Sequence, residues 1–394
     1  MRHYCYSWKM HFLYSIVLLF AVVPSFFADE AWSRDAWSDA AHLCHAPDGF
    51  AFASKGPIDS KVYPDDCDDG DSTIFNGLLC ASGDKRGCEA VKRSLTTEAG
   101  LDESRMWRSP RRAQTDNLHR ENGGLVTGDS GEHKTFSPDQ ELGLLLYAVT
   151  TGDKSSLERW FNWLDHNRPW ADQGTKVHNV PRYCHHQNCT MRPIDRDMDD
   201  AVFRALGGES PDGIRNYKLN ATLLTLPITM VVPGAQTILQ LYLNMNVGDK
   251  IYYEATLNAP NFPTHLSAIR AWLLVKIQHP NQGRAKETIA MIANKQPKNP
   301  FYQYLHEGAT PKVAVLVKKY CPAPSQSRGG DLGHWTWESD SSDWKIPAKI
   351  DNGKPSSMLW DCIFMRNLLG DHGKGLGVEH TGTENAISGL LLGE

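Results

Sequence analysis

Several common classes of protein leave no signature in this sequence. It has no Gly-x-Ser-x-Gly elbow of a serine hydrolase, no glycine-rich phosphate loop, no dinucleotide-binding glycine motif and no His-Glu-x-x-His zinc helix. It also has no excess of positive charge, since 41 Lys and Arg stand against 46 Asp and Glu and the net charge is −5. A chain of this charge does not attract polyanions in general. We therefore expect no nucleic-acid partner, and no metal or organic cofactor.

The amino terminus carries the pattern of a secretory signal. Arg2 and Lys9 precede an apolar run over 12–23, which has the length of a signal core and is short for a membrane span. The pattern predicts a signal peptide over 1–28 and a single domain over 29–394. We expect the mature protein to be secreted or periplasmic, with no stable membrane insertion after signal cleavage. An uncleaved anchor stays open, because the cleavage site is weak.

Nine cysteines are present, and Cys5 lies within the predicted signal. The remaining eight are an even number, and an exported chain favours disulfides over free thiols. The shortest spacings suggest Cys80 with Cys88 or Cys184 with Cys189, while the full pairing stays open. The second of these pairs also encloses two histidines, so a zinc site is the alternative there, although oxidation competes for its thiols.

The segment 137–165 predicts an antiparallel helical hairpin. It opens with Ser-Pro-Asp-Gln, which supplies a cap residue, a proline at the first helical position and a glutamine three residues after the cap. Leucines follow at helical spacing, and Gly152 ends this first helix. Ser155 and Glu158 form a second capping box ahead of another apolar stripe.

The same Gly-Asp turn recurs along the chain. Gly-Asp-Lys occurs at 83–85, 152–154 and 248–250, each after an apolar helical stretch, and a weaker copy occurs at 370–371. Repetition of helix, turn and helix predicts stacked helical hairpins, because one hairpin cannot bury its apolar stripe alone. Coincidence stays open, since Gly-Asp is a common helix stop.

The sequence predicts an all-α fold with long loops, because strand patterns are few. Further helices are expected over 266–277, 286–293, 358–369 and 384–391. Long polar loops are expected over 45–70, 107–136, 168–213 and 321–355. Loops of this length in one domain are typical of functional lids and rims.

These hairpins resemble the (α/α)6 toroids of carbohydrate-active enzymes. The stretch from Ser-Pro-Asp-Gln at 137–140 to Thr-Gly-Asp at 151–153 is similar to the hairpin that carries a catalytic aspartate in unsaturated glucuronyl hydrolases. The acidic run at 68–71 is similar to the position of their second functional aspartate. This resemblance covers 65–165 and implies a ring of six hairpins whose loops line a glycan groove. The stretch 360–365 is also similar to an uncharacterised secreted bacterial family, which implies no chemistry.

Glycoside cleavage commonly uses two carboxyl groups, and Asp71 and Asp139 are the leading candidates, with Asp69 as a further one. Asp71 and Asp139 each begin a helix that precedes a Gly-Asp-Lys turn, so parallel hairpins would bring them to one end. A helix amino terminus stabilises the charged carboxylate, which suits a base. A general acid there needs apolar burial or a neighbouring carboxylate. Ordinary capping roles stay open for both residues.

Aromatic and charged loop residues are candidates for contact with a substrate. Flat rings stack on sugars, and guanidinium groups pair with carboxylates, which suggests an anionic glycan. Ordinary packing or a solvated surface is the alternative for each of them. The candidates are Trp107, Arg108, Asp197, Trp335, Trp337 and Glu338.

The sequence therefore favours an exported enzyme that hydrolyses a polysaccharide or oligosaccharide. A non-catalytic, disulfide-stapled binding or envelope protein is the second hypothesis, because a fold does not imply a function. A uronate lyase is the third, with Tyr183, His185 and His186 as conceivable participants. Carboxyl groups of Asp139 and Asp71 or Asp69 about 5 to 10 Å apart would favour hydrolysis.

Overall fold

The described part of the chain is mostly helical, as the sequence predicts, with four strands of three residues each. The structure is a computed structural model that describes residues 37–38, 41–54, 67, 69–97, 102–115, 138–167, 193–209, 241–242, 244–258, 262–321, 358–374 and 376. Three expectations lie outside these residues: the signal peptide, the fate of Cys184 and Cys189, and the helix over 384–391.

Two helical hairpins lie where the sequence predicts them. They consist of α3 (Ser72–Ala81) with α4 (Lys85–Arg93), and of α7 (Pro138–Thr151) with α8 (Lys154–Asn167). Gly83 and Gly152 join the helices with φ angles of 97° and 74°, in the left-handed region that favours glycine at helix ends. Asp84 and Asp153 then accept backbone N–H groups from the first turn of the following helix, at 2.9 and 3.0 Å.

The third Gly-Asp-Lys copy is not a turn. Gly248 and Asp249 lie inside the first turn of α12 (Val247–Leu257), whose N-cap is Asn246. The Asn246 side chain accepts the backbone N–H of Asp249 at 2.9 Å, so an asparagine cap starts the helix before the glycine is reached. The weaker fourth copy does end a helix, because Gly370, with φ of 53°, follows α17 (Met358–Leu369).

The helices α3 and α7 run parallel and touch backbone to backbone. Gly77 and Gly143, each the sixth residue of its helix, meet so closely that a Cβ on Gly77 would lie 2.4 Å from the Cα of Gly143. One turn earlier, the third residues of the two helices are hydrogen-bonded, from the backbone N of Ile74 to Oε1 of Gln140 at 3.2 Å. Two contacts in the same register bring the amino-terminal ends of both helices together.

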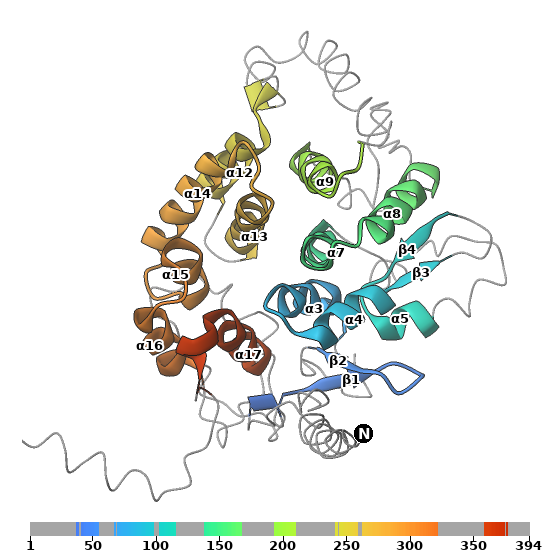
Figure 1. Cartoon of the computed structure of the whole chain (residues 1–394), viewed down its shortest axis with the longest axis horizontal. Helices are drawn as coiled ribbons and strands as arrows, with labels where there is room; N and C mark the ends of the chain where they lie inside the picture. Colours follow the sequence, from blue (N-terminus) through green and yellow to red (C-terminus); the bar gives the residue numbers. More distant parts are fainter. Residues whose placement is uncertain are drawn as a thin grey trace, which may run out of the picture.

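The remaining helices surround this pair or cover it from outside (Figure 1). They are α5 (Pro110–Thr115), α9 (Pro193–Ala205), α13 (Phe262–Lys276), α14 (Gln282–Lys295), α15 (Pro300–Glu307), α16 (Pro311–Tyr320) and the short 3₁₀ segment η4 (Gly370–Gly373). In Figure 1, α3, α7, α9, α13 and α17 lie around the centre, with α4, α8, α14 and α16 farther out. The expected helices over 266–277, 286–293 and 358–369 are confirmed by α13, α14 and α17, although α13 ends one residue earlier than predicted.

Two of the expected loops contain helices. Helix α5 lies within 107–136, and α9 lies within 168–213. The apolar residues Ile194, Met198 and Val202 of α9 are fully buried and recur at helical spacing. This apolar spacing predicts a helix, but the many acidic residues of the segment led us to expect a loop.

Two short antiparallel strand pairs flank the first hairpin. They are β1 (Leu43–His45) with β2 (Ala51–Ala53), and β3 (Leu95–Thr97) with β4 (Ser104–Met106). Three disulfides add covalent links in the described part of the chain, namely Cys44–Cys67, Cys80–Cys88 and Cys321–Cys362. The suggested pairing of Cys80 with Cys88 is thereby confirmed.

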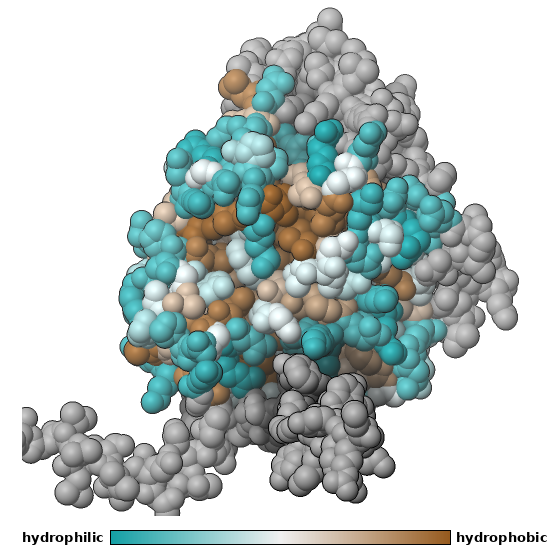
Figure 2. Space-filling view, viewed as in Figure 1, coloured by the Kyte–Doolittle hydropathy of each residue, from teal (hydrophilic) through white to brown (hydrophobic). Residues whose placement is uncertain are grey.

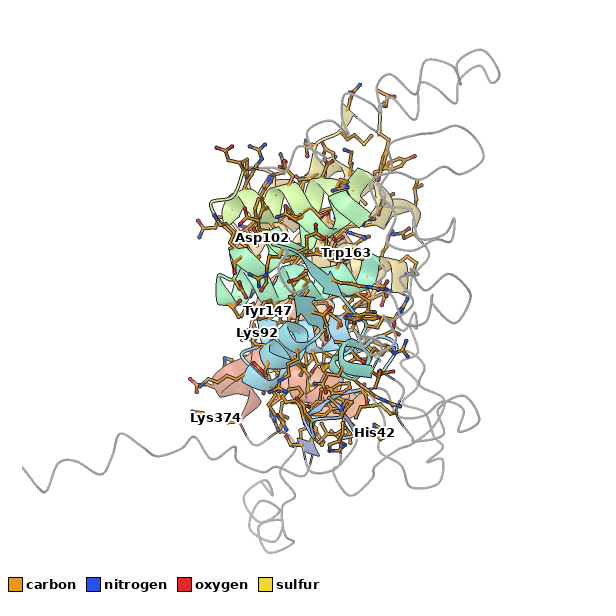
Figure 3. The ribbon with its side chains drawn as sticks, turned by 90° about the vertical axis from the view of Figure 1, so that its right-hand side faces the viewer. His42, Lys92, Asp102, Tyr147, Trp163 and Lys374 are labelled. Atoms are coloured by element: carbon orange, nitrogen blue, oxygen red, sulfur yellow. A yellow bond between two sulfur atoms is a disulfide. The ribbon has the colours of Figure 1, made fainter. Side chains whose placement is uncertain are left out.

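The larger of two hydrophobic clusters in the described residues extends from α3 to α17. Aromatic rings join its parts, and Phe301 of α15 lies 5.9 Å from Trp272 of α13 and 5.5 Å from Phe364 of α17, between ring centroids. Figure 2 shows hydrophobic side chains in the middle of one face, where Figure 1 places α7, α9 and α13. Figure 3 labels Tyr147 of α7 and Trp163 of α8 among the packed side chains. No helix of the described residues is long and apolar enough to cross a membrane.

Candidate active site

Asp71 occupies the N-cap position of α3, yet its side chain makes no capping hydrogen bond. The first four N–H groups of a helix need acceptors beyond the helical ladder, and an N-cap aspartate is a common source. In α3 these N–H groups are accepted by backbone oxygens and by the Gln140 side chain, and none is accepted by the Asp71 carboxylate. The donors and acceptors are Ser72 N to Asp69 O at 3.3 Å, Thr73 N to Arg108 O at 3.0 Å, Ile74 N to Gln140 Oε1 at 3.2 Å and Phe75 N to Asp71 O at 3.3 Å. The Asp71 carboxylate therefore accepts no N–H group of its own helix and accepts from Gln140 of α7 instead.

Gln140 connects the carboxylates of Asp71 and Asp139. Its side-chain Nε2 donates to Oδ1 of Asp71 and to Oδ2 of Asp139, each at 3.2 Å. The two carboxylate oxygens are consequently no farther apart than twice that distance. The structure thus brings the two leading candidates to the same end of the parallel helices, as the hairpin pattern predicts.

Arg108 places a positive charge beside this pair. Its Nη1 lies 3.5 Å from Oδ1 of Asp71 and donates to the backbone O of Gly70 at 3.0 Å. The Asp71 side chain is 29% exposed and that of Arg108 is 19% exposed. Both are therefore partly accessible to a molecule that approaches this end of the helices.

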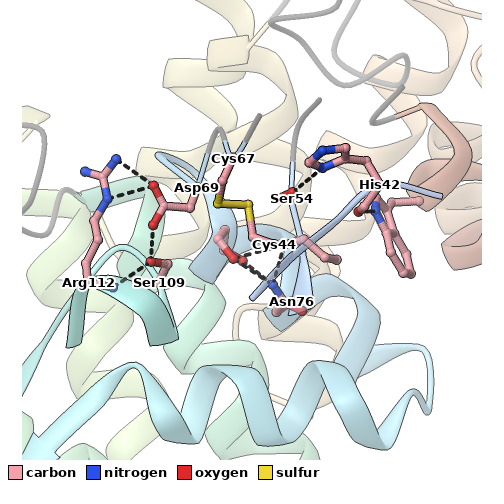
Figure 4. Close-up of a disulfide and its surroundings, with 11 residues drawn as sticks. His42, Cys44, Ser54, Cys67, Asp69, Asn76, Ser109 and Arg112 are labelled. Carbon is pink, nitrogen blue, oxygen red and sulfur yellow. Dashed lines mark hydrogen bonds and ion pairs between the residues drawn. A yellow bond between two sulfur atoms is a disulfide. The ribbon is translucent and has the colours of Figure 1, made fainter. Parts of the chain in front are cut away.

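Asp69 is engaged in a separate, buried ion pair. Its Oδ1 accepts Nε of Arg112 at 2.9 Å, and its Oδ2 accepts the hydroxyl of Ser109 at 2.5 Å (Figure 4). The residue is 3% exposed and lies beside the Cys44–Cys67 disulfide (Figure 4). This pair anchors the segment before α3 to the start of α5. Because both oxygens are bonded and the residue is buried, its carboxylate cannot reach a substrate. The position of Asp69 therefore contradicts the expected catalytic role.

Trp107 also belongs to the interior rather than to a binding surface. It is 1% exposed, the guanidinium of Arg105 lies 4.0 Å from its ring centroid, and its Nε1 donates to Oγ1 of Thr96 at 3.0 Å. The backbone O of Trp107 accepts the hydroxyl of Thr73 at 2.9 Å. The expectation that this ring stacks on a sugar is therefore wrong for this conformation, and the residue instead secures the start of α3.

Three aspartates of α9, namely Asp195, Asp197 and Asp199, are buried, although a polar loop was expected over 168–213. Asp197 pairs with the buried Lys250 of α12 and also lies in the wall of a pocket described below. Asp195 accepts from Nη2 of Arg270 in α13 at 2.8 Å. The cluster thus holds α9 to its neighbours, because buried charges require partners.

Asp199 and Glu141 form a buried carboxyl pair between α9 and α7. Desolvation by burial raises the pKa of Asp199 well above its ordinary value, and the charge of Glu141 raises it further. Glu141 accepts Nε1 of Trp160 at 3.0 Å. Both residues are buried, so neither carboxyl group can reach a substrate from solvent.

A pocket of about 470 Å³ lies elsewhere, at the carboxyl ends of α9 and α13 and the start of α12. Its polar lining includes Asp200, Arg204, Asn246 and His279. Burial lowers the pKa of His279, and the charge of Asp200 opposes that shift. Neither Asp71 nor Asp139 lines this pocket, whereas Asp197, one of the candidates for substrate contact, does.

The other expected site residues lie outside the described residues. These are Trp335, Trp337 and Glu338, and the lyase candidates Tyr183, His185 and His186. Within the described part of the chain, no group of three or more His, Cys, Asp or Glu side chains is placed to hold a metal ion. Comparisons with protein-family models, with curated proteins and with solved structures found no match.

The arrangement at the helix starts can perform acid–base chemistry. Two carboxylates share one amide donor, and a guanidinium lies beside one of them. Of the candidates that the structure describes, Asp71, Asp139 and Arg108 come together, while Asp69, Trp107 and Asp197 serve other contacts. Gln140 is the site residue that sequence reasoning used only as part of a helix start.

Proposed function

We propose that this protein is an exported glycan hydrolase whose helical hairpins form a toroid-like ring, with Asp71 and Asp139 as its catalytic carboxyl groups. The observation that carries the proposal is the single amide nitrogen of Gln140, which lies 3.2 Å from both carboxylates. Capping alone does not account for this arrangement, because Asp71 makes no side-chain bond to its own helix.

The two carboxylates have different surroundings, which suits different roles. Arg108 stabilises a negative charge on Asp71, so Asp71 is the nucleophile or base. Asp139 is then the acid that protonates the leaving glycosidic oxygen. The shared donor keeps one oxygen of each carboxylate within twice 3.2 Å of the other, which admits the separation of about 5 Å of a retaining pair.

A retaining reaction balances with these two carboxyl groups and one water molecule. Asp71 attacks the anomeric carbon while Asp139 gives its proton to the departing oxygen, which breaks the glycosidic bond. Asp139 then takes a proton from water, and the resulting hydroxide releases the sugar from Asp71. Arg108 favours a substrate that carries carboxylate or sulfate groups.

The test is hydrolysis by the purified mature protein, measured as new reducing ends on acidic and neutral polysaccharides. We expect Asp71→Asn and Asp139→Asn each to lower turnover about 100-fold or more, because an amide neither attacks nor donates a proton as a carboxyl group does. Asp84→Asn is the matched control, since Asp84 caps α4 and asparagine caps equally well.

Three results would contradict the proposal. Full turnover by folded Asp71→Asn and Asp139→Asn variants would remove the pair from catalysis. An unsaturated product, seen by ultraviolet absorbance, would indicate elimination by a lyase. Glycan binding with no turnover by the native protein would indicate the binding or envelope protein.

A further inference from the structure

Gln140 is a buried side chain whose amide contacts both the backbone of α3 and the two carboxylates. It is 0% exposed and is the third residue of α7. Its Oε1 accepts the backbone N–H of Ile74, and its Nε2 donates to Asp71 and Asp139. The partners determine the orientation of the amide, because the oxygen must face an N–H donor and the NH₂ must face the carboxylates.

One half of this amide replaces Asp71 as a cap. The third N–H of a helix is the usual partner of an N-cap side chain, and in α3 that donor belongs to Ile74. Gln140 supplies the acceptor from a neighbouring helix, 66 residues away along the chain. Asp71 can therefore stand at a helix start without turning its carboxylate back to the backbone.

The other half of the amide lies between two groups of like charge. Two negative charges held this close together repel each other. An NH₂ group that donates to both oxygens stabilises both charged forms and sets their separation. Gln140 thus determines where the two carboxylates lie and also stabilises their negative charges.

We infer that Gln140 is a positioning residue, which holds the carboxylates of Asp71 and Asp139 at a set separation and takes over the capping of α3. The inference deepens the proposed function and rests on it for its catalytic meaning. Its structural content concerns the hydrogen bonds of Gln140 to these two aspartates and to α3. It can therefore be tested without a known substrate.

Two variants remove the bridge between the carboxylates, one with the cap of α3 kept and one with it lost. Gln140→Glu keeps an acceptor for Ile74 and replaces the NH₂ by a third carboxylate oxygen, so it retains the cap and loses the bridge. Gln140→Met has a similar volume and loses both. Gln303→Met is the matched control, because Gln303 is also buried and donates to the backbone O of Ala293, at 2.9 Å, far from the site.

The experiment is a titration of the full chain labelled with ¹³C at aspartate carboxyl carbons and followed by NMR. Asp71→Asn and Asp139→Asn spectra assign the two resonances. We expect the midpoint of at least one of the two to rise by about one pH unit in both Gln140 variants, because a donor to the charged form is lost. The Gln303→Met variant should reproduce the native curves.

Unchanged midpoints in a folded Gln140→Glu or Gln140→Met variant would overturn the inference. The outcome does not depend on catalysis, so the two proposals can fail separately. Shifted midpoints in a protein that cleaves no glycan would contradict the proposed function alone. Once a substrate is found, the acid limb of the pH–rate profile should move with the midpoints in the variants.

Discussion

At the residue scale, the buried imidazole of His265 links the stability of the fold to pH. The side chain is 1% exposed in α13, and its ring lies 5.5 Å from that of Phe301, between centroids. Burial lowers its pKa from 6.5 to about 3. Below pH 6.5 the unfolded chain takes up a proton that the folded chain refuses, so the free energy of unfolding falls as pH falls. The loss ends near pH 3.

Replacement of this histidine should flatten that dependence. Between pH 6.5 and 5 the native protein should lose about 2 kcal/mol more of its unfolding free energy than His265→Leu, at about 1.4 kcal/mol for each pH unit. Urea unfolding at the two pH values measures the difference. His45→Gln, at an exposed site, serves as the control. Equal pH dependence in the native protein and His265→Leu would contradict the assignment.

The residue scale also shows where sequence reasoning stops. Tryptophan and aspartate in polar segments were expected to face a ligand, and Trp107 and Asp197 are buried instead. Each has a partner from another element of the chain, Thr96 of β3 for the indole N–H and Lys250 of α12 for the carboxylate. Burial of a polar residue depends on such distant partners, and residue type alone does not reveal them.

At the element scale, the contact of α3 with α7 decides whether the candidate site exists. A Cβ on Gly143 would lie 2.3 Å from the backbone O of Thr73 and 2.8 Å from the Cα of Ile74. Backbone atoms cannot move aside as a side chain can, so the two helices would have to separate. The hydrogen bonds of Gln140 span the same interface, one turn from this glycine.

Substitution of this glycine should therefore be costly. We expect Gly143→Ala to lower the free energy of unfolding by about 3 kcal/mol, despite the better helix propensity of alanine. Gly283→Ala in α14 is the control, since no atom lies within 4 Å of its added Cβ, and it should be neutral or stabilising by up to about 1 kcal/mol. Urea unfolding compares them, and a Gly143→Ala variant as stable as the native chain would contradict the close contact.

The sequence predicts the ends of helices correctly where a glycine end and an aspartate cap lie next to each other. Glycine and aspartate at 83–84 and 152–153 end one helix and cap the next, because both interactions lie within a few residues. The same pair at 248–249 fails as a turn, since Asn246 already caps α12. Helix α9 was missed because its buried charges concealed an apolar stripe.

At the scale of the whole molecule, disulfides join elements that differ greatly in their separation along the chain. Cys80–Cys88 links neighbouring helices across 8 residues, and Cys321–Cys362 links the end of α16 to α17 across 41. A cross-link restricts the unfolded chain more strongly when it closes a longer loop. The longer link should therefore contribute more to the stability of the molecule.

Removal of each link by paired alanine substitutions tests this ranking. The loop lengths predict that Cys321→Ala with Cys362→Ala lowers the free energy of unfolding by about 1.4 kcal/mol more than Cys80→Ala with Cys88→Ala. Chemical denaturation without reductant gives both values. An equal or opposite ranking would show that native-state packing, and not loop closure, dominates.

By itself, the sequence determined the helical class, the two hairpins with their Gly-Asp turns, and the location of Asp71 and Asp139 at helix starts. Caps, glycines and apolar spacing act over a few residues, so they can be recognised along the chain. Only the tertiary structure decided that Gln140 caps α3 from another helix and joins both carboxylates, and that Asp69 is locked in an ion pair. Those outcomes depend on hydrogen bonds between distant segments, which exist only once Gly77 and Gly143 let two helices meet.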